Sequence, residues 1–164
     1  MNSIATKFEF NFDSIEQYVE NVKGIDMQAV QTTAGIYQSK HRLVTLPKLE
    51  LWHRYNSCGT IHEGILQPGY VYLIIPKMHV NIFVNGKELS FSELYVIASS
   101  EDQISRMPPG FDTYAIVIKE QTFLEYVDQE TLDRLVKRTS QIRAGKIELP
   151  HLVKLKQDII NLIE

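Results

Sequence analysis

Short apolar runs alternate with turn residues through the middle of the chain, from about residue 27 to residue 119. The runs are rich in Val, Ile, Tyr and Phe, which pack well on a pleated surface, and Gly, Pro, Asn and Ser recur between them. This pattern predicts a series of short strands. We expect these strands near 27–33, 35–46, 49–57, 60–66, 70–76, 79–84, 87–91, 94–98, 103–107 and 112–119.

The stretch VNIFVNGKEL, residues 80–89, contains the strongest turn signal. Asn85 and Gly86 favour a type I′ hairpin, because both central residues of that turn have positive φ. Two further turns, at 67–70 and 108–111, place Pro directly before Gly, which suits a type II turn. The hairpin would pair Val84 with Lys87, Ile82 with Leu89 and Val80 with Phe91.

Helical spacing precedes and follows this region. Asp13 and Glu16 have the spacing of a capping box, and Gly24 can end the short helix that they begin. After Lys119 apolar residues again recur at intervals of three and four. The helices expected there run over 121–127, from a cap at Asp128 to Gly145, and onward from Pro150.

The order of elements is therefore a helix, a long series of strands, and then helices, which predicts an α+β chain. Many short strands at regular spacing indicate a sandwich or a closed barrel. We expect a jelly-roll-like antiparallel β-barrel over residues 1–120 and an appended helical arm over residues 121–164.

The last predicted helix carries a wide apolar stripe. Ile160 and Ile163 widen a row of residues at a/d spacing. The stripe could lie on the barrel, but left exposed it would be a liability, so we predict a homodimer through this helix. The residues expected to form the dimer contact are Leu152, Leu155, Ile159 and Leu162.

Composition narrows the classes of function. The chain has 164 residues, about one domain, and a net charge of −3, which gives no electrostatic case for DNA binding by this segment. Its single cysteine, Cys58, excludes an intramolecular disulfide and suits a reducing cytosol. There is no signal sequence and no apolar run of membrane-spanning length. We therefore expect a cytoplasmic protein without membrane contact.

The sequence contains no pattern that indicates catalysis. A metal-binding β-barrel usually supplies His-x-His on one strand, but here Glu63 follows His62 directly and points to the other face. No nucleophile elbow or phosphate loop is present, and Cys58 is interpreted as an inert buried residue. We expect no metal, no cofactor and no enzymatic activity. The histidines, which we interpret as surface or hydrogen-bonded residues, are His41, His53, His62, His79 and His151.

Aromatic and polar residues on the strands are the remaining candidates for a binding site. Trp52 and Arg54 share one strand face, and an arginine beside an indole could hold an anionic or planar ligand. The alternative is that Trp52 is core and Arg54 a surface charge. The candidate ligand-binding residues are Tyr37, Trp52, Arg54, Tyr72 and Tyr114.

Three stretches resemble the effector-binding domain of bacterial AraC-type transcriptional regulators. The first stretch begins FEFNFDSIEQYVENVKG. The second is LELWHRYNSCGTIHEGILQPGYVYLIIP, and the third is VNIFVNGKELSFSELYVIASSEDQISRMPPGFDTYAIVI. The resemblance covers roughly residues 8–164. The Pro-Gly turns and the Asn-Gly-Lys-Glu-Leu hairpin occur in the expected order. The resemblance implies a cupin-like barrel that senses a small molecule, followed by helices that dimerise.

The sequence departs from this family after the barrel. No helix-turn-helix follows within these 164 residues, and residues 121–164 contain seven Lys/Arg and seven Asp/Glu, so they are not a basic DNA-reading arm. We expect a regulatory half that contacts DNA only through a helix-turn-helix domain absent from this sequence; the alternative is a naturally short relative.

Two other functions remain open. One is a small cupin enzyme, an isomerase or metal-dependent oxygenase, which would contain bound metal. The other is a structural dimerisation domain whose barrel is filled by side chains.

Overall fold

The computed structural model describes residues 5–22, 25–77, 81–89, 95–98, 102–140 and 149–163. In order, its elements are β1 (Thr6–Phe12), α1 (Ile15–Asn21), β2 (Ile25–Gln31), β3 (Ser39–Thr45), β4 (Leu49–Asn56), β5 (Thr60–Leu66), β6 (Tyr70–Pro76), β7 (Ile82–Val84), β8 (Lys87–Leu89), β9 (Tyr95–Ala98), β10 (Asp102–Met107), β11 (Phe111–Lys119), α2 (Glu120–Phe123), α3 (Gln129–Ser140) and α4 (Leu149–Ile163).

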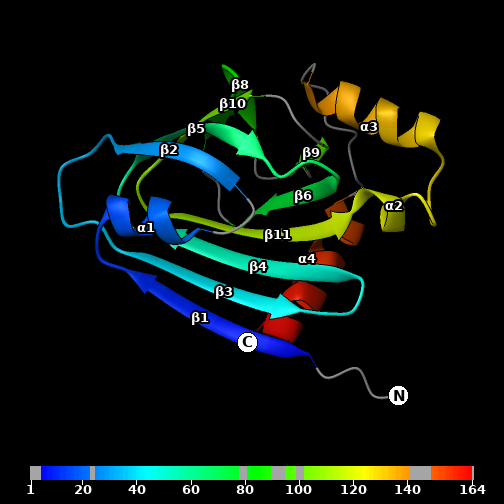
Figure 1. The fold of residues 1–164 in the computed structure, drawn as a ribbon, viewed down its shortest axis with the longest axis horizontal. Helices are drawn as coiled ribbons and strands as arrows, with labels where there is room; N and C mark the ends of the chain where they lie inside the picture. Colours follow the sequence, from blue (N-terminus) through cyan, green and yellow to red (C-terminus); the bar gives the residue numbers. More distant parts are fainter. Residues whose placement is uncertain are drawn as a thin grey trace.

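The strands form two antiparallel sheets that lie as layers (Figure 1). One has six strands in the order β1-β3-β4-β11-β6-β9, and the other has five in the order β2-β5-β10-β7-β8. In the described part of the chain no ladder of hydrogen bonds joins them, because β1 pairs with β3 alone and β2 with β5 alone. The α+β class is confirmed, but the expected closed barrel is wrong: these are two open sheets.

Strand alternation decides which residues face the space between the sheets. In β4, Trp52 and Arg54 face inward, while Leu51 packs on the outer face. In β11, Thr113 faces inward and Tyr114 outward. The inner core brings together the buried residues Leu43, Trp52, Tyr72, Ile82, Val84, Ile97, Phe111 and Val117.

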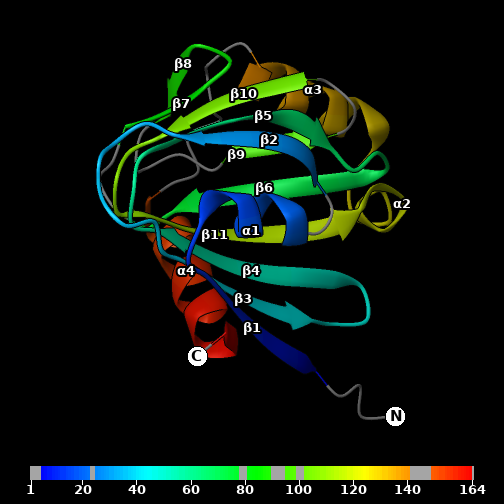
Figure 2. The ribbon, with the colours of Figure 1, turned by 60° about the vertical axis from the view of Figure 1, so that its left-hand side comes forward.

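The helices cover different parts of this arrangement. The short helix α1 lies between the two sheets' first strands, with Tyr18 packed against Phe12 of β1 and Met27 of β2 (Figure 2). Helix α3 packs Leu132 on the outer face of the six-stranded sheet near Val71.

Helix α4 lies across the same outer face, behind β3, β4 and β11 in Figure 1. Ile159 is 2% exposed, and Leu155 is partly buried in the same cluster. These two predicted dimer residues therefore pack against the chain's own sheet, and the homodimer through this helix stays a prediction. Leu162 is 48% exposed, and the side chain of Leu152 lies outside the described residues.

The predicted turns are confirmed. Asn85 and Gly86 have φ values of 49° and 75°, and Gly69 and Gly110 also have positive φ. The expected pairs of Val84 with Lys87 and Ile82 with Leu89 are present. The pairing of Val80 with Phe91 and the helix ends at Gly24 and Gly145 lie outside the described residues.

At the N-terminus one prediction is wrong and one strand was missed. The cap of α1 is Ser14, not Asp13: its hydroxyl accepts from the backbone N–H of Gln17, whose side chain accepts from the backbone N–H of Asp13. The motif is thus shifted by one residue. Strand β1 was not predicted at all, although Phe8, Phe10 and Phe12 alternate with polar residues along it.

Candidate ligand-binding cavity

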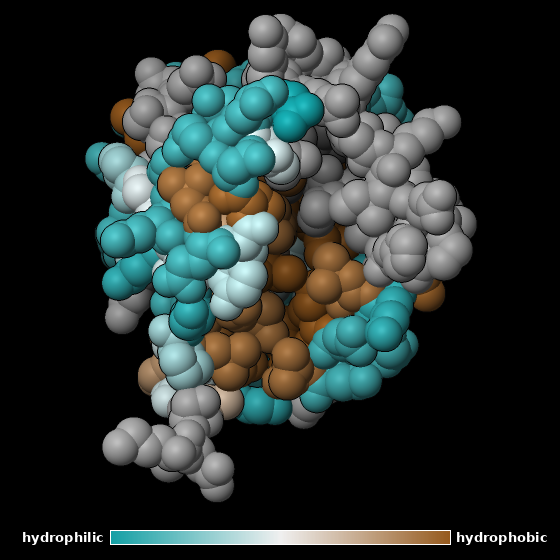
Figure 3. Space-filling model, turned by 90° about the vertical axis from the view of Figure 1, so that its right-hand side faces the viewer, coloured by the Kyte–Doolittle hydropathy of each residue, from teal (hydrophilic) through white to brown (hydrophobic). Residues whose placement is uncertain are grey.

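A cavity of about 110 Å³ lies between the two sheets. It is larger than one water molecule needs and is of the order of the ~150 Å³ engineered cavity that admits benzene. Seen from the right-hand side of Figure 1, the molecule is hollowed and the walls of the hollow are largely hydrophobic (Figure 3). The lining residues are Tyr18, Met27, Trp52, Arg54, Asn56, His62, Gly64, Tyr72, Ile74, Ile82, Val84, Ile97, Gln103, Ser105, Met107, Phe111, Thr113, Ala115 and Val117.

Both sheets and α1 contribute to this lining. Aromatic and aliphatic side chains form most of the wall, and a few polar groups interrupt it. Among the described lining residues there are one arginine and one histidine but no aspartate or glutamate. A mostly apolar cavity with few polar groups is the usual composition of a small-molecule site.

Arg54 supplies the positive charge of the cavity. The Cζ atom of its guanidinium lies 4.5 Å from the centre of the Trp52 ring, a cation–π contact. Its Nε atom is buried and has no hydrogen-bond partner among the described residues. Glu50, on the same strand face, instead accepts a hydrogen bond from the Trp52 indole at 3.1 Å. None of the ion pairs in the described part of the chain includes Arg54.

Two histidines and a tyrosine surround this arginine. The Tyr18 ring lies 5.1 Å from the His41 ring and 5.5 Å from the His62 ring. Burial and the Arg54 charge lower the pKa of His62 to about 4 and that of His41 to about 2. Both imidazoles are therefore neutral near pH 7. Burial also raises the pKa of Tyr18, although the charge of Arg54 and a hydrogen bond with it oppose the shift.

His41 and His62 differ in their hydrogen bonding. His41 Nε2 lies 2.9 Å from the Ser39 hydroxyl, which in turn donates to Asn56 Oδ1. His62 Nε2 is buried without a hydrogen-bond partner among the residues that the structure describes. The cavity wall thus contains two nitrogen atoms, on Arg54 and His62, that no protein group in the described chain satisfies.

The structure places three of the five predicted ligand residues together. Trp52, Arg54 and Tyr72 line the cavity. Tyr37 does not: it packs beneath α1, and its hydroxyl lies 3.5 Å from Asn56 Oδ1. Tyr114 does not either, because it faces outward and packs against α4.

The sequence predictions missed His62 and Tyr18. His62 was interpreted as a surface or hydrogen-bonded residue, but it is buried and its Nε2 has no hydrogen-bond partner among the described residues. It lies on the sheet opposite Arg54. Tyr18 was assigned only to the apolar face of the first helix. The alternation of β11 could have separated Tyr114 from Thr113 and Ala115, which do line the cavity.

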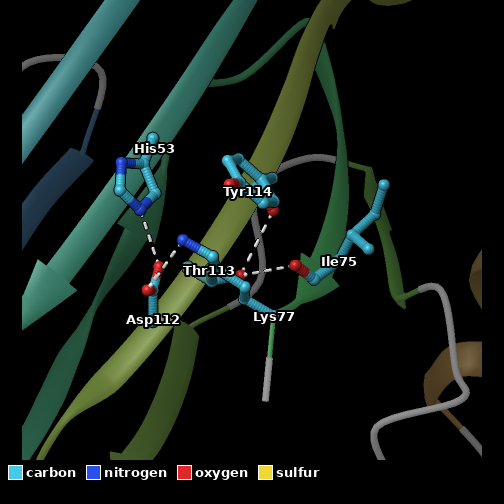
Figure 4. A network of polar contacts seen from close by, with 6 residues as sticks. All are labelled: His53, Ile75, Lys77, Asp112, Thr113 and Tyr114. Atoms are coloured by element: carbon cyan, nitrogen blue, oxygen red, sulfur yellow. Dashed lines mark hydrogen bonds and ion pairs between the residues drawn. The ribbon is translucent and has the colours of Figure 1, made fainter. Parts of the chain in front are cut away.

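A second polar cluster lies on the outer face of the six-stranded sheet (Figure 4). Asp112 on β11 contacts His53 Nε2 at 2.7 Å through Oδ1 and Lys77 Nζ at 3.3 Å through Oδ2. Burial acts to raise the pKa of Asp112, but the hydrogen bonds and charges of His53 and Lys77 outweigh it and hold the pKa below its usual value. This cluster connects three neighbouring strand regions on the side away from the cavity.

Among the described residues, no group of three or more His, Cys, Asp or Glu is arranged to hold a metal ion. No helix in the described part of the molecule is long and apolar enough to cross a membrane. Cys58 is buried, and its Sγ donates to the Ile36 carbonyl at 3.5 Å.

Comparison with known proteins supports the fold. The crystal structure of the AraC-like transcriptional activator CuxR is similar, with a TM-score of 0.53 over 95% of this chain and 69% of that chain. The two sequences are 8% identical over the match, so the likeness shows a shared fold. No protein-family model matches the sequence, and no curated protein matches it significantly.

Proposed function

We propose that this chain is the regulatory, non-catalytic ligand-binding domain of an AraC-type transcriptional regulator, with a cupin-like β-sandwich that senses a small molecule. The observation that carries the proposal is the apolar cavity between the two sheets, whose wall holds a few polar groups. The fold shared with an AraC-like activator supports it. DNA contact belongs, on this proposal, to a helix-turn-helix domain outside these 164 residues.

Strand β4 connects the cavity to helix α4. Trp52 and Arg54 face the cavity from β4, and Leu51, which directly precedes Trp52, packs beneath α4. A ligand that binds one arrangement of these strands better than another would shift the position of α4. The predicted homodimer through this helix remains part of the proposal, and Leu162 is the predicted contact residue that the structure leaves exposed.

The single tryptophan provides a direct test. Because Trp52 is the only tryptophan in the sequence and lines the cavity, its fluorescence responds to a ligand bound there. Titration with a panel of small amphipathic metabolites should give saturable changes in emission for at least one compound. The same compound should raise the melting temperature, since a ligand bound only by the native state stabilises it. A panel that produces neither effect would contradict the proposal and favour a filled structural domain.

A further inference from the structure

No described residue of the cavity wall supplies a negative charge to balance Arg54. Arg54 is a cation whose Nε is buried without a hydrogen-bond partner among the described residues, although the side chain as a whole is partly exposed and hydrogen-bonds Tyr18. A charge partly withdrawn from water is costly unless an opposite charge or hydrogen-bond acceptor meets it. The ring of Trp52 offsets part of this cost but accepts no hydrogen bond in the guanidinium plane.

The second unsatisfied nitrogen has the same requirement. His62 Nε2 is buried in the cavity wall, and the ring is neutral near pH 7, so it can donate one hydrogen bond without adding charge. Arg54 and His62 come from opposite sheets and line one cavity. Together they offer donors and a single positive charge, which matches a singly charged anion better than a phosphate dianion.

The rest of the wall defines the body of the ligand. Beyond the polar groups, the lining is mainly aliphatic and aromatic, and the volume of about 110 Å³ suits a group the size of one ring or a short chain. A hydrophilic anion would leave this apolar surface without contacts. The complementary molecule therefore has one charged end and one apolar end.

We propose that the cavity binds a small monocarboxylate with a ring-sized apolar body, whose carboxylate pairs with Arg54 and accepts a hydrogen bond from His62. This inference rests on the proposed function, since it names the ligand class of the same site. A carboxylate accepts two hydrogen bonds from a guanidinium in a planar fork, which supplies the partner that Arg54 Nε lacks.

The first experiment compares acids with their uncharged amides on the wild-type protein. Trp52 fluorescence is titrated at pH 7.5 with benzoate against benzamide and with hexanoate against hexanamide. We expect at least one acid to bind about tenfold or more tightly than its amide, the size of one lost charged hydrogen bond.

The outcomes separate this inference from the proposed function. If amides or other neutral compounds bind as tightly as the acids, the cavity binds ligands but the carboxylate assignment is overturned. If these acids fail while other members of the metabolite panel bind, the assignment is likewise overturned. If no compound binds at all, both proposals fail.

A pair of variants locates the charge that matters. Arg54→Gln should remove the preference for acid over amide, whereas Arg42→Gln should retain it, because Arg42 pairs with Glu9 at the surface. Retention of the preference in Arg54→Gln would overturn the role of Arg54. Should that variant not fold, the comparison of acid and amide on the wild-type protein still decides the ligand class.

Discussion

At the scale of single residues, the unusual chemistry of this protein is concentrated where α1 meets the two sheets. His41 and His62 are buried there, and Arg54 is partly buried near them. Only one of them is charged near pH 7, because burial and the arginine's charge lower the pKa of both histidines. Near pH 7 the interior therefore holds one charged side chain, Arg54, and two neutral imidazoles.

The buried histidines predict a loss of stability in mild acid. Below pH 6.5 the unfolded chain takes up protons on these residues, whereas the folded protein does not until the pH approaches the lowered values of about 4 for His62 and about 2 for His41. The stability is therefore fully present above pH 6.5 and falls as the pH drops. Urea unfolding should show a decrease of about 1–2 kcal/mol per histidine between pH 6.5 and 5.

A variant tests which group is responsible. His62→Gln should remove about half of this pH dependence, because the amide does not titrate and His41 still does. A wild-type free energy of unfolding that stays level between pH 7 and pH 5 would show that the imidazoles are not held neutral.

At the scale of elements, strand positions were readable from the sequence but long-range partners were not. Turn residues such as Asn85-Gly86 act locally, so the ten predicted strands correspond to β2 through β11 with small shifts at their ends. The alternation of Phe8, Phe10 and Phe12 also indicated β1 and could have been used. The proximity of Arg54 to His62 depends on how two sheets stack, which no local pattern contains.

The terminal helix shows a different limit. Its apolar stripe correctly indicated a buried face, but periodicity does not identify the surface that buries it. The structure covers Leu155 and Ile159 with the chain's own six-stranded sheet. The same limit explains the partly correct prediction of the cavity residues. Residue type was enough to identify Trp52, Arg54 and Tyr72, whereas Tyr114 could be excluded only by the face of β11 on which it lies.

Helix α4 provides a matched pair of substitutions. Ile159→Ala should lower the free energy of unfolding by about 2–4 kcal/mol, because Ile159 is buried against the sheet. Leu162→Ala, on the same helix but 48% exposed, should cost less than about 1 kcal/mol. Chemical denaturation gives both values, and light scattering gives the mass. A lower mass with unchanged stability in Ile159→Ala would instead place that residue in a dimer contact.

The Asp112 cluster predicts how firmly β4, β11 and the end of β6 are held together. Asp112→Asn should cost about 1–3 kcal/mol, since its carboxylate is 15% exposed and meets both His53 and Lys77. Glu9→Gln removes an exposed pair with Arg42 and should cost less than about 1 kcal/mol. Urea unfolding at pH 7 measures the difference.

The contribution of Asp112 to stability also depends on pH. Because the pKa of Asp112 is lowered in the folded protein, its contribution is present above the unfolded value and is lost as the pH falls through the folded one. Equal costs for the two substitutions would show that the cluster acts as an ordinary surface pair.

At the scale of the whole molecule, the cavity is a feature that stability alone does not explain. A volume of about 110 Å³ between well-packed sheets corresponds to roughly 2–3 kcal/mol of packing energy that tighter side chains would supply. Both sheets contribute to its wall, so a bound molecule would contact each of them at once. The proposed ligand-binding function requires such contact with both sheets.

Filling the cavity therefore separates stability from function. Ala115 faces the cavity from β11, between Trp52 and Ile74 in the register of the sheet. Ala115→Leu should leave the free energy of unfolding unchanged or raise it by up to about 2 kcal/mol. At the same time, the ligand-dependent changes in Trp52 fluorescence should disappear. Ala29→Leu is the matched control, because Ala29 is half-buried outside the cavity and binding should survive there. Loss of stability in Ala115→Leu together with full retention of ligand binding would mean that the ligand occupies another part of the molecule.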